Sequence, residues 1–147
     1  MTRIEYPPFD FRIKKENEKE WIFDEVRKQW VRLTPEEWVR QNILQYLLQV
    51  KKYPASLIAV EKEIALGELR KRFDILVYKE AKPWMIIECK EMNVPLSEAT
   101  IRQILNYNIT IRADYIMVTN GTEHRAFCIA KGIPEPIAEL PETGSSN

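Results

Sequence analysis

Histidine and cysteine are scarce in this sequence, with one His and two Cys among 147 residues. A structural zinc site needs four ligands, usually in paired spacings, so His124, Cys89 and Cys128 together fall one ligand short. Two Cys residues cannot build a disulfide framework and are better interpreted as small core residues. Ser-His-Asp or Cys-His catalysis would depend on His124, which follows a turn-like Asn-Gly-Thr-Glu run without a nucleophile elbow. Any chemistry is therefore expected from carboxylates and lysines, with or without a metal.

Long apolar runs, an excess of one charge sign and a nucleotide-binding loop are also missing. The longest apolar stretches, such as 84–87, are far shorter than the roughly 20 residues that cross a bilayer, and residues 1–10 lack the apolar core of a signal peptide. We therefore predict no membrane association and a cytoplasmic location. Lys plus Arg and Asp plus Glu number 22 each, which does not indicate a protein that coats nucleic acid. The missing Gly-x-x-x-x-Gly-Lys-Ser/Thr loop excludes ATP-driven translocation by this chain.

The remaining pattern is typical of one α/β domain with additions at both ends. A chain of this length buries roughly two-thirds of its unfolded surface, which is enough for a single core. We predict an N-terminal hairpin-like extension over 1–33, a core over 34–133 and a loose tail over 134–147. The extension is predicted because apolar residues alternate over 9–13 and return at 21–23. The tail is rich in proline and ends in Gly-Ser-Ser-Asn.

The predicted core runs helix, three strands, helix, two strands. Thr34, Pro35 and Glu37 form a capping box that opens a helix extending to about Lys52. Ser97 is the predicted N-cap of a second helix, which continues to about Arg112. Strand-like runs fill the intervals, at 57–64, 72–78, 84–89, 115–119 and 125–129. This order predicts an α/β sandwich in which helices flank a mixed central sheet.

Two acids and a lysine interrupt the apolar strands of this core. Strand alternation places Glu88 and Lys90 on one face at the end of an apolar strand, with Cys89 on the other. A hairpin between the neighbouring strands would bring Asp74 alongside them. Charges at such a position cost desolvation energy unless they are paired or bind a ligand. Hard carboxylate oxygens at one sheet edge suit Mg²⁺ or Mn²⁺.

The spacing of one Asp followed by Glu-x-Lys on the next strand resembles the PD-(D/E)XK nuclease superfamily. The resemblance extends to both helices, because Glu37 lies on the first, while Gln103 and Tyr107 match a Gln-x-x-x-Tyr pattern on the second. More narrowly, residues 30–130 resemble the family similar to the N-terminal domain of type I restriction-enzyme R subunits. Phe73 replaces the proline that often precedes the first acid. The implied fold is a restriction-endonuclease-like αβββαβ core, here with an N-terminal β-hairpin extension.

The resemblance implies metal-dependent hydrolysis of DNA phosphodiester bonds by an endonuclease. Asp74, Glu88 and the Cys89 carbonyl, together with Glu37, would ligate Mg²⁺ or Mn²⁺. Lys90 would position or activate the attacking water, and Gln103 would orient Lys90 or contact the nucleic-acid backbone. Tyr107 would support that helix, and a basic cluster would contact phosphates: Arg70, Lys71 and Arg72. A homodimer is expected if both strands are cut, and a separately encoded partner protein remains open.

Each candidate also has a structural interpretation. Asp74 can be a salt-bridge partner of Arg72 or Lys90, and the capping box alone explains Glu37, for which Glu36, Glu61 or Glu63 would be the substitutes. The Gln103 and Tyr107 pair can be ordinary polar helix positions, and the tryptophans are better explained as packing residues than as base-stacking platforms. The alternative function is a non-catalytic nuclease-fold module for nucleic-acid binding or assembly, or a nuclease directed at RNA. Sequence preference, oligomeric state, pathway and the role of residues 1–30 are not predicted.

Overall fold

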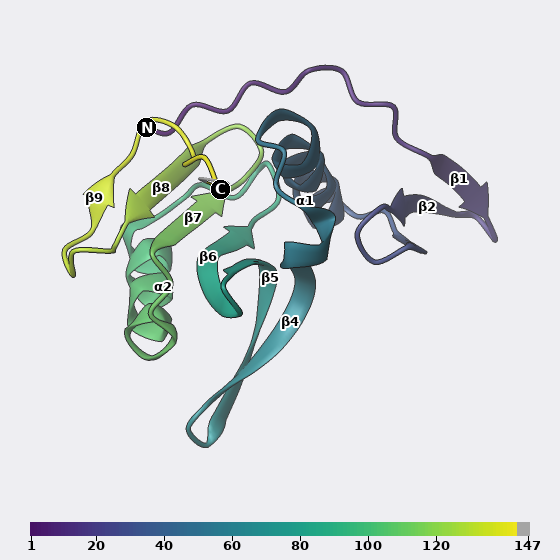
Figure 1. The fold of residues 1–147 in the computed structure, drawn as a ribbon. Coiled ribbons are helices and arrows are strands. Elements are labelled where there is room, and N and C mark those ends of the chain that lie inside the picture. Colours follow the sequence, from purple (N-terminus) through teal and green to yellow (C-terminus); the bar gives the residue numbers. More distant parts are fainter. Residues whose placement is uncertain (144–147) are drawn as a thin grey trace.

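The computed structural model describes residues 1–143 as a six-stranded mixed sheet with a helix on each face and a separate three-stranded sheet before it (Figure 1). The small sheet contains β1 (Ile13–Glu16), β2 (Lys19–Asp24) and β3 (Gln29–Arg32), all antiparallel. It confirms an N-terminal β extension and adds a third strand to the predicted hairpin. This third strand is the short run that follows the turn at 25–28.

The large sheet has the strand order β4-β5-β6-β7-β8-β9, and only β6 and β7 are parallel. Its strands are β4 (Ile58–Leu66), β5 (Leu69–Lys79), β6 (Lys82–Cys89), β7 (Tyr115–Thr119), β8 (His124–Cys128) and β9 (Glu135–Pro136). The parallel pair requires a crossover, which α2 (Glu98–Ile111) supplies. The predicted helix, three-strand, helix, two-strand core is thus confirmed.

The first helix ends earlier than the apolar pattern predicts. α1 (Pro35–Gln45) begins at the expected cap, where the Thr34 hydroxyl accepts a hydrogen bond from the Glu37 backbone N–H. The chain then continues as a π-helical segment, η1 (Tyr46–Val50), and a short 3₁₀ turn, η2 (Ala55–Leu57). The periodicity over 39–50 does not separate α from π geometry, because both bury one face of the segment.

The two faces of the sheet carry separate cores. Ile75, Ile87 and Met117 pack with α1, whereas Leu76, Ile86 and Ile116 pack with α2. Successive residues of each strand thus alternate between the helices, as expected for central strands that are covered on both faces. The sequences of β5, β6 and β7 are nearly continuous apolar runs because both faces of these strands are buried.

The C-terminal segment is more ordered than the loose tail that we predict from residue 134. Glu135–Pro136 pairs with β8 as β9, and Leu140 is buried. The Tyr53 hydroxyl donates a hydrogen bond to the Pro141 carbonyl at 2.6 Å. These long-range contacts have no local sequence signal. Residues 144–147 of the predicted tail lie outside the described part of the chain.

The N-terminal segment crosses the top of the molecule and brings its first residues beside β8 and β9 (Figure 1). The Thr2 backbone N–H donates to the His124 carbonyl, and the Thr2 hydroxyl donates to the Ile137 carbonyl. Tyr6 packs edge-on against Tyr46 and His124. Among residues 1–143, no helix is long and apolar enough to cross a membrane.

Candidate active site

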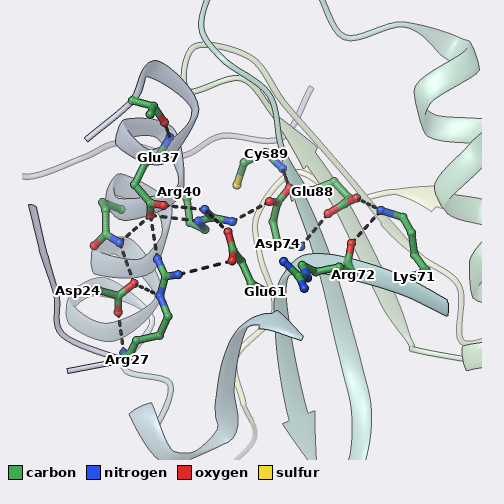
Figure 2. A network of polar contacts seen from close by, with 12 residues as sticks. Asp24, Arg27, Glu37, Arg40, Glu61, Lys71, Arg72, Asp74, Glu88 and Cys89 are labelled. Carbon is green, nitrogen blue, oxygen red and sulfur yellow. Dashed lines mark hydrogen bonds and ion pairs between the residues drawn. The ribbon is translucent and has the colours of Figure 1, made fainter. Parts of the chain in front are cut away.

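Asp74 and Glu88 meet across the β5–β6 pair, as the hairpin prediction requires. The Asp74 backbone N–H donates to Glu88 Oε2 at 2.9 Å, and the Cys89 backbone N–H donates to Asp74 Oδ2 at 2.8 Å. Both carboxylates are therefore anchored by backbone N–H groups of the neighbouring strand (Figure 2). Lys90 follows directly after β6, and its backbone N–H is fixed by the Thr119 carbonyl at 2.8 Å.

A local twist of two strands positions these acids. Residues two apart in a regular strand share a face, yet Phe73 packs with α2 and Ile75 packs with α1. The same reversal occurs in β4 around Glu61, whose φ of 53° is in the left-handed region. Glu61 and Asp74 are opposite each other in the register, between the pairs Val60–Ile75 and Lys62–Phe73. Because of this reversal, the carboxylates of Glu61 and Asp74 both point toward α1, where they contact the same arginine.

That arginine is Arg40, a buried side chain that the sequence analysis missed. Its Nη1 donates to Asp74 Oδ1 at 2.8 Å, and its Nη2 contacts Glu37 Oε1 at 2.6 Å and Glu61 Oε1 at 2.9 Å. The pKa of Arg40 is raised, because the attraction of these acids outweighs its burial. The signal that could have identified it is the spacing of three between Glu37 and Arg40 on a helix.

Glu37 is held within this arginine network. Its Oε2 accepts hydrogen bonds from Arg40 Nε at 3.1 Å, Gln41 Nε2 at 2.9 Å and Arg27 Nη2 at 3.2 Å. Burial alone would raise the pKa of Glu37, but these bonds from Arg40 and Gln41 outweigh it and lower that pKa. The predicted metal role of Glu37 therefore has no support in this arrangement.

Glu36, the neighbouring acid, is the helix carboxylate whose pKa responds to the charge of Asp74. Partial burial and the negative charge of Asp74 raise the pKa of Glu36, while Arg40 and Lys90 oppose the rise. Glu36 is exposed and lies in the first turn of α1, where a carboxylate is favoured by the helix dipole. It is therefore the better candidate for a third acid near Asp74 and Lys90.

Lys71 approaches Glu88 from the side opposite to Arg40 (Figure 2). Its Nζ lies 3.0 Å from Glu88 Oε1 and donates to the Arg72 carbonyl at 2.9 Å. The ammonium also lies 5.1 Å from the Phe73 ring centre and 5.5 Å from the Tyr107 ring centre. Lys71 is thus part of the carboxylate site, whereas the sequence placed it only in the phosphate-binding cluster.

The other predicted residues are distributed unevenly around this centre. Tyr107 packs edge-on against Phe73 and so borders the Lys71 side. Gln103 lies one turn earlier on α2 and is exposed. Arg70 and Arg72 are exposed on the β4–β5 hairpin, where Arg70 pairs with Glu63. The Cys89 thiol is fully buried in the core on the α1 side, which leaves its backbone as the group at the site.

Electrostatic strain between the two strand acids is the main property of the site. Burial and the adjacent Glu88 raise the pKa of Asp74 to about 7, although the Cys89 N–H and Arg40 oppose the rise. Only 17% of the Asp74 side chain and 9% of the Glu88 side chain are exposed. In residues 1–143, no group of three or more His, Cys, Asp or Glu side chains forms a preassembled metal cage. Two neighbouring carboxylates nevertheless fit a hard divalent cation that takes its other ligands from backbone and water.

Comparisons with known proteins identify the family and the fold of this chain. Residues 35–141 match the model of the family described as type I restriction enzyme R protein N terminus (HSDR_N). A fragment of "a putative HsdR subunit of a type I restriction enzyme" from Vibrio vulnificus YJ016 superimposes with a TM-score of 0.56 at 19% identity. That match covers 76% of this chain and 24% of the other, so this chain spans about a quarter of that protein's length.

A second solved structure shares the fold over most of both chains. It is described as "a putative nuclease belonging to DUF820" from Anabaena variabilis ATCC 29413. The TM-score is 0.51 at 13% identity, with 88% of this chain and 86% of that chain covered. The restriction-endonuclease-like nuclease fold predicted from the sequence is thereby confirmed. No curated protein matches the chain.

Proposed function

Because the chain belongs to the family of type I restriction enzyme R protein N termini, we propose that it hydrolyses DNA phosphodiester bonds with Mg²⁺ or Mn²⁺. The observation that carries this proposal is the close approach of Asp74 and Glu88 across β5 and β6, with Lys90 directly after β6. Two buried acids that repel each other are stabilised by a divalent cation, which also supplies the charge that phosphate chemistry needs.

The residues of this chain have distinct roles in the proposal. Asp74, Glu88 and the Cys89 carbonyl would hold the metal, which would supply charge for phosphate chemistry and for activating water. Lys90 orients the attacking water at its Nζ and stabilises developing negative charge. We place Glu36 rather than Glu37 as the additional acid, because the charge of Asp74 reaches Glu36 while Glu37 is occupied by two arginines.

Basic side chains around the site would hold the DNA backbone. The Lys71 ammonium pairs with Glu88. When that carboxylate binds the metal, Lys71 would be released to pair with a phosphate. Exposed Arg70 and Arg72 on the adjacent hairpin would add contacts that give affinity without sequence readout. Gln103 on α2 would contact the nucleic-acid backbone. Since one site of this kind cuts one strand, cleavage of both strands would require a homodimer or a separately encoded partner.

The direct test is cleavage of supercoiled plasmid, linear duplex, single-stranded DNA and RNA in Mn²⁺, with EDTA as the metal-free control. We expect metal-dependent cutting of DNA that Asp74→Asn abolishes. Cutting confined to RNA would replace the substrate class while leaving the catalytic proposal intact. Cutting that survives Asp74→Asn or EDTA would contradict the proposed site.

A second function is favoured by one specific observation. Each strand acid already has a cation, Arg40 on Asp74 and Lys71 on Glu88, as expected for a structural ion cluster in a non-catalytic binding or assembly module. Calorimetry separates the two functions, because a metal site binds Mn²⁺ and loses that binding in Glu88→Gln. Failure of the intact chain to bind Mn²⁺, together with no cleavage, would favour the binding module.

A further inference from the structure

The N-terminal three-stranded sheet presents three large aromatic side chains on one face. Lys14 pairs with Trp21 across β1 and β2, while Trp21 pairs with Arg32 and Phe23 with Trp30 across β2 and β3. Paired residues of antiparallel strands lie on the same face, so the three aromatic rings form one surface. All three are half-buried, and Phe23 and Trp30 meet edge-on at 5.4 Å.

The opposite face of this sheet supplies its packing. Ile22 and Asp24 alternate with the aromatic residues along β2, and both are fully buried. Asp24 accepts hydrogen bonds from Arg27 and Gln41, which tie the sheet to α1. The aromatic face is therefore not the surface that holds the sheet to the body. Figure 1 shows β1 and β2 beyond α1, on the side away from α2.

Basic side chains are interleaved with the aromatic rings. The Arg12 guanidinium carbon lies 4.3 Å from the Phe23 ring centre, and Lys14 Nζ lies 4.5 Å from the Trp30 ring centre. The Arg32 guanidinium carbon lies 5.7 Å from the Trp21 ring centre. Register places four basic residues and one acid on this face: Arg12, Lys14, Lys19, Arg32 and Glu16. The face is positive although the whole chain has a formal net charge of zero.

We propose that this aromatic face, defined by Trp21, Phe23, Trp30, Arg12, Lys14 and Arg32, binds single-stranded nucleic acid. A single strand offers a base to stack on each ring and a phosphate to pair with each cation. Each ring can therefore replace its contact with a cation by a contact with a base, while the cation moves to a phosphate. Duplex DNA keeps its bases stacked on one another and offers only phosphates to such a face. A strongly acidic peptide would satisfy the cations but leave the rings without stacking partners.

The proposed binding face is separate from the chemistry at Asp74. It lies in residues 12–32, before the family match begins at residue 35, and it uses none of the residues assigned to cleavage. The small sheet is nevertheless joined to α1, because Arg27 in the β2–β3 turn contacts both Asp24 and Glu37. A strand bound on this face would therefore be held on the sheet that contacts α1, the helix that carries Arg40.

Two neighbouring lysines give a matched test. Lys14 lies on the aromatic face, whereas Lys15 is exposed on the opposite one, and Lys14→Glu and Lys15→Glu change the net charge equally. The assay is fluorescence anisotropy of labelled oligothymidylate of about 15 nucleotides in EDTA, on the full chain carrying Asp74→Asn so that cleavage cannot interfere. We expect Lys14→Glu to weaken binding by about ten-fold and Lys15→Glu to have less than about a three-fold effect.

Stacking is tested by Trp30→Leu, which removes the ring and retains apolar bulk. We expect a loss of about ten-fold for the single strand and little change for a duplex of the same length. Circular dichroism and urea unfolding identify any variant that fails to fold. If Trp30→Leu does not fold, the comparison of Lys14→Glu with Lys15→Glu still tests the proposal. Equal weakening by both lysine variants, or no binding of the single strand, would overturn the proposal, whether or not the chain cuts DNA. Binding of poly-glutamate that depends equally on Lys14 would assign the face to an acidic protein instead.

Discussion

Arg40 pairs with Asp74 and Lys71 pairs with Glu88, and of these two cations Arg40 makes the larger number of contacts between elements. It is buried, and it joins Glu37, Glu61 and Asp74, which come from three different elements. Removing one partner of a buried ion pair leaves an uncompensated charge, which costs more than the pair contributes while intact. Arg40 therefore stabilises the site by neutralising acids that cannot avoid burial.

The prediction for this network concerns Arg40→Met. We expect it to lower the free energy of unfolding by about 3 kcal/mol, because Glu37 and Asp74 lose their buried partner. The double variant Glu37→Gln with Arg40→Met should lose less than the sum of the single changes, as measured by urea denaturation in a double-mutant cycle. Strict additivity would show that the two residues do not act as a pair.

A second prediction at this scale concerns pH and Asp74. Its pKa is raised to about 7 by burial and Glu88, so a proton must leave when a cation binds there. Mn²⁺ affinity should rise as pH increases from about 6 to about 8, with net proton release seen as a buffer-dependent binding enthalpy in calorimetry. The raised pKa also means that stability associated with Asp74 is full below pH 4 and is lost as pH rises through 7. If the Mn²⁺ affinity of Asp74→Asn depends on pH in the same way as that of the intact chain, Asp74 is not the group that releases the proton.

At the scale of elements, the strands were predictable and the irregular junctions were not. Apolar runs identified β5, β6 and β7, the capping box at Thr34 located the start of α1, and the N-cap Ser97 located the start of α2, because these signals are local. The π segment, β9 and the twist at Glu61 and Asp74 depend on contacts between distant residues. Asp74 and Glu88 follow from strand order, whereas the partners Arg40 and Lys71 depend on side-chain directions that this twist sets.

The attachment of the N-terminal segment to β8 gives a prediction at this scale. His124 is buried between Tyr6 and Thr119, whose hydroxyl lies 2.7 Å from His124 Nδ1, and burial lowers the His124 pKa to about 4. A lowered pKa means that stability is full above about pH 6.5 and is lost as pH falls toward 4, since the unfolded chain takes up the proton first. The raised pKa of Asp74 adds stability as pH falls through the same window, so the His124 loss is measured as a difference in thermal midpoint between the intact chain and a His124 variant.

The matched variant for that prediction is His124→Gln, which cannot take up a proton. We expect its melting temperature to be lower than that of the intact chain at pH 7, and we expect this difference to shrink as pH falls from 6.5 to 4.5. The lowered pKa values of Asp24 and Glu37 add losses that begin in the ordinary carboxylate range and continue as pH falls below it. An unchanged slope in His124→Gln would place the pH sensitivity elsewhere.

At the scale of the whole molecule, the chain joins a nuclease-fold core to an N-terminal sheet through one continuous polar network. Asp24, Arg27, Glu37 and Arg40 connect β2 to Asp74 without a break (Figure 2). Each junction is a charge-assisted hydrogen bond, which fixes orientation as well as position. The proposed strand-binding face and the proposed cleavage site are thus parts of one rigid assembly.

The measurement that tests the central claim most directly compares two lysines at opposite ends of β6. Lys90 follows the strand at the carboxylates, whereas Lys82 begins it and is exposed. Supercoiled plasmid is incubated with Mn²⁺ and the intact chain, Lys90→Ala or Lys82→Ala, while calorimetry confirms that each protein binds Mn²⁺. We predict that Lys82→Ala cuts like the intact chain and that Lys90→Ala binds the metal but cuts at least about 100-fold more slowly. Equal cutting by the two variants, or none by the intact chain in the presence of bound Mn²⁺, would contradict the proposed nuclease site.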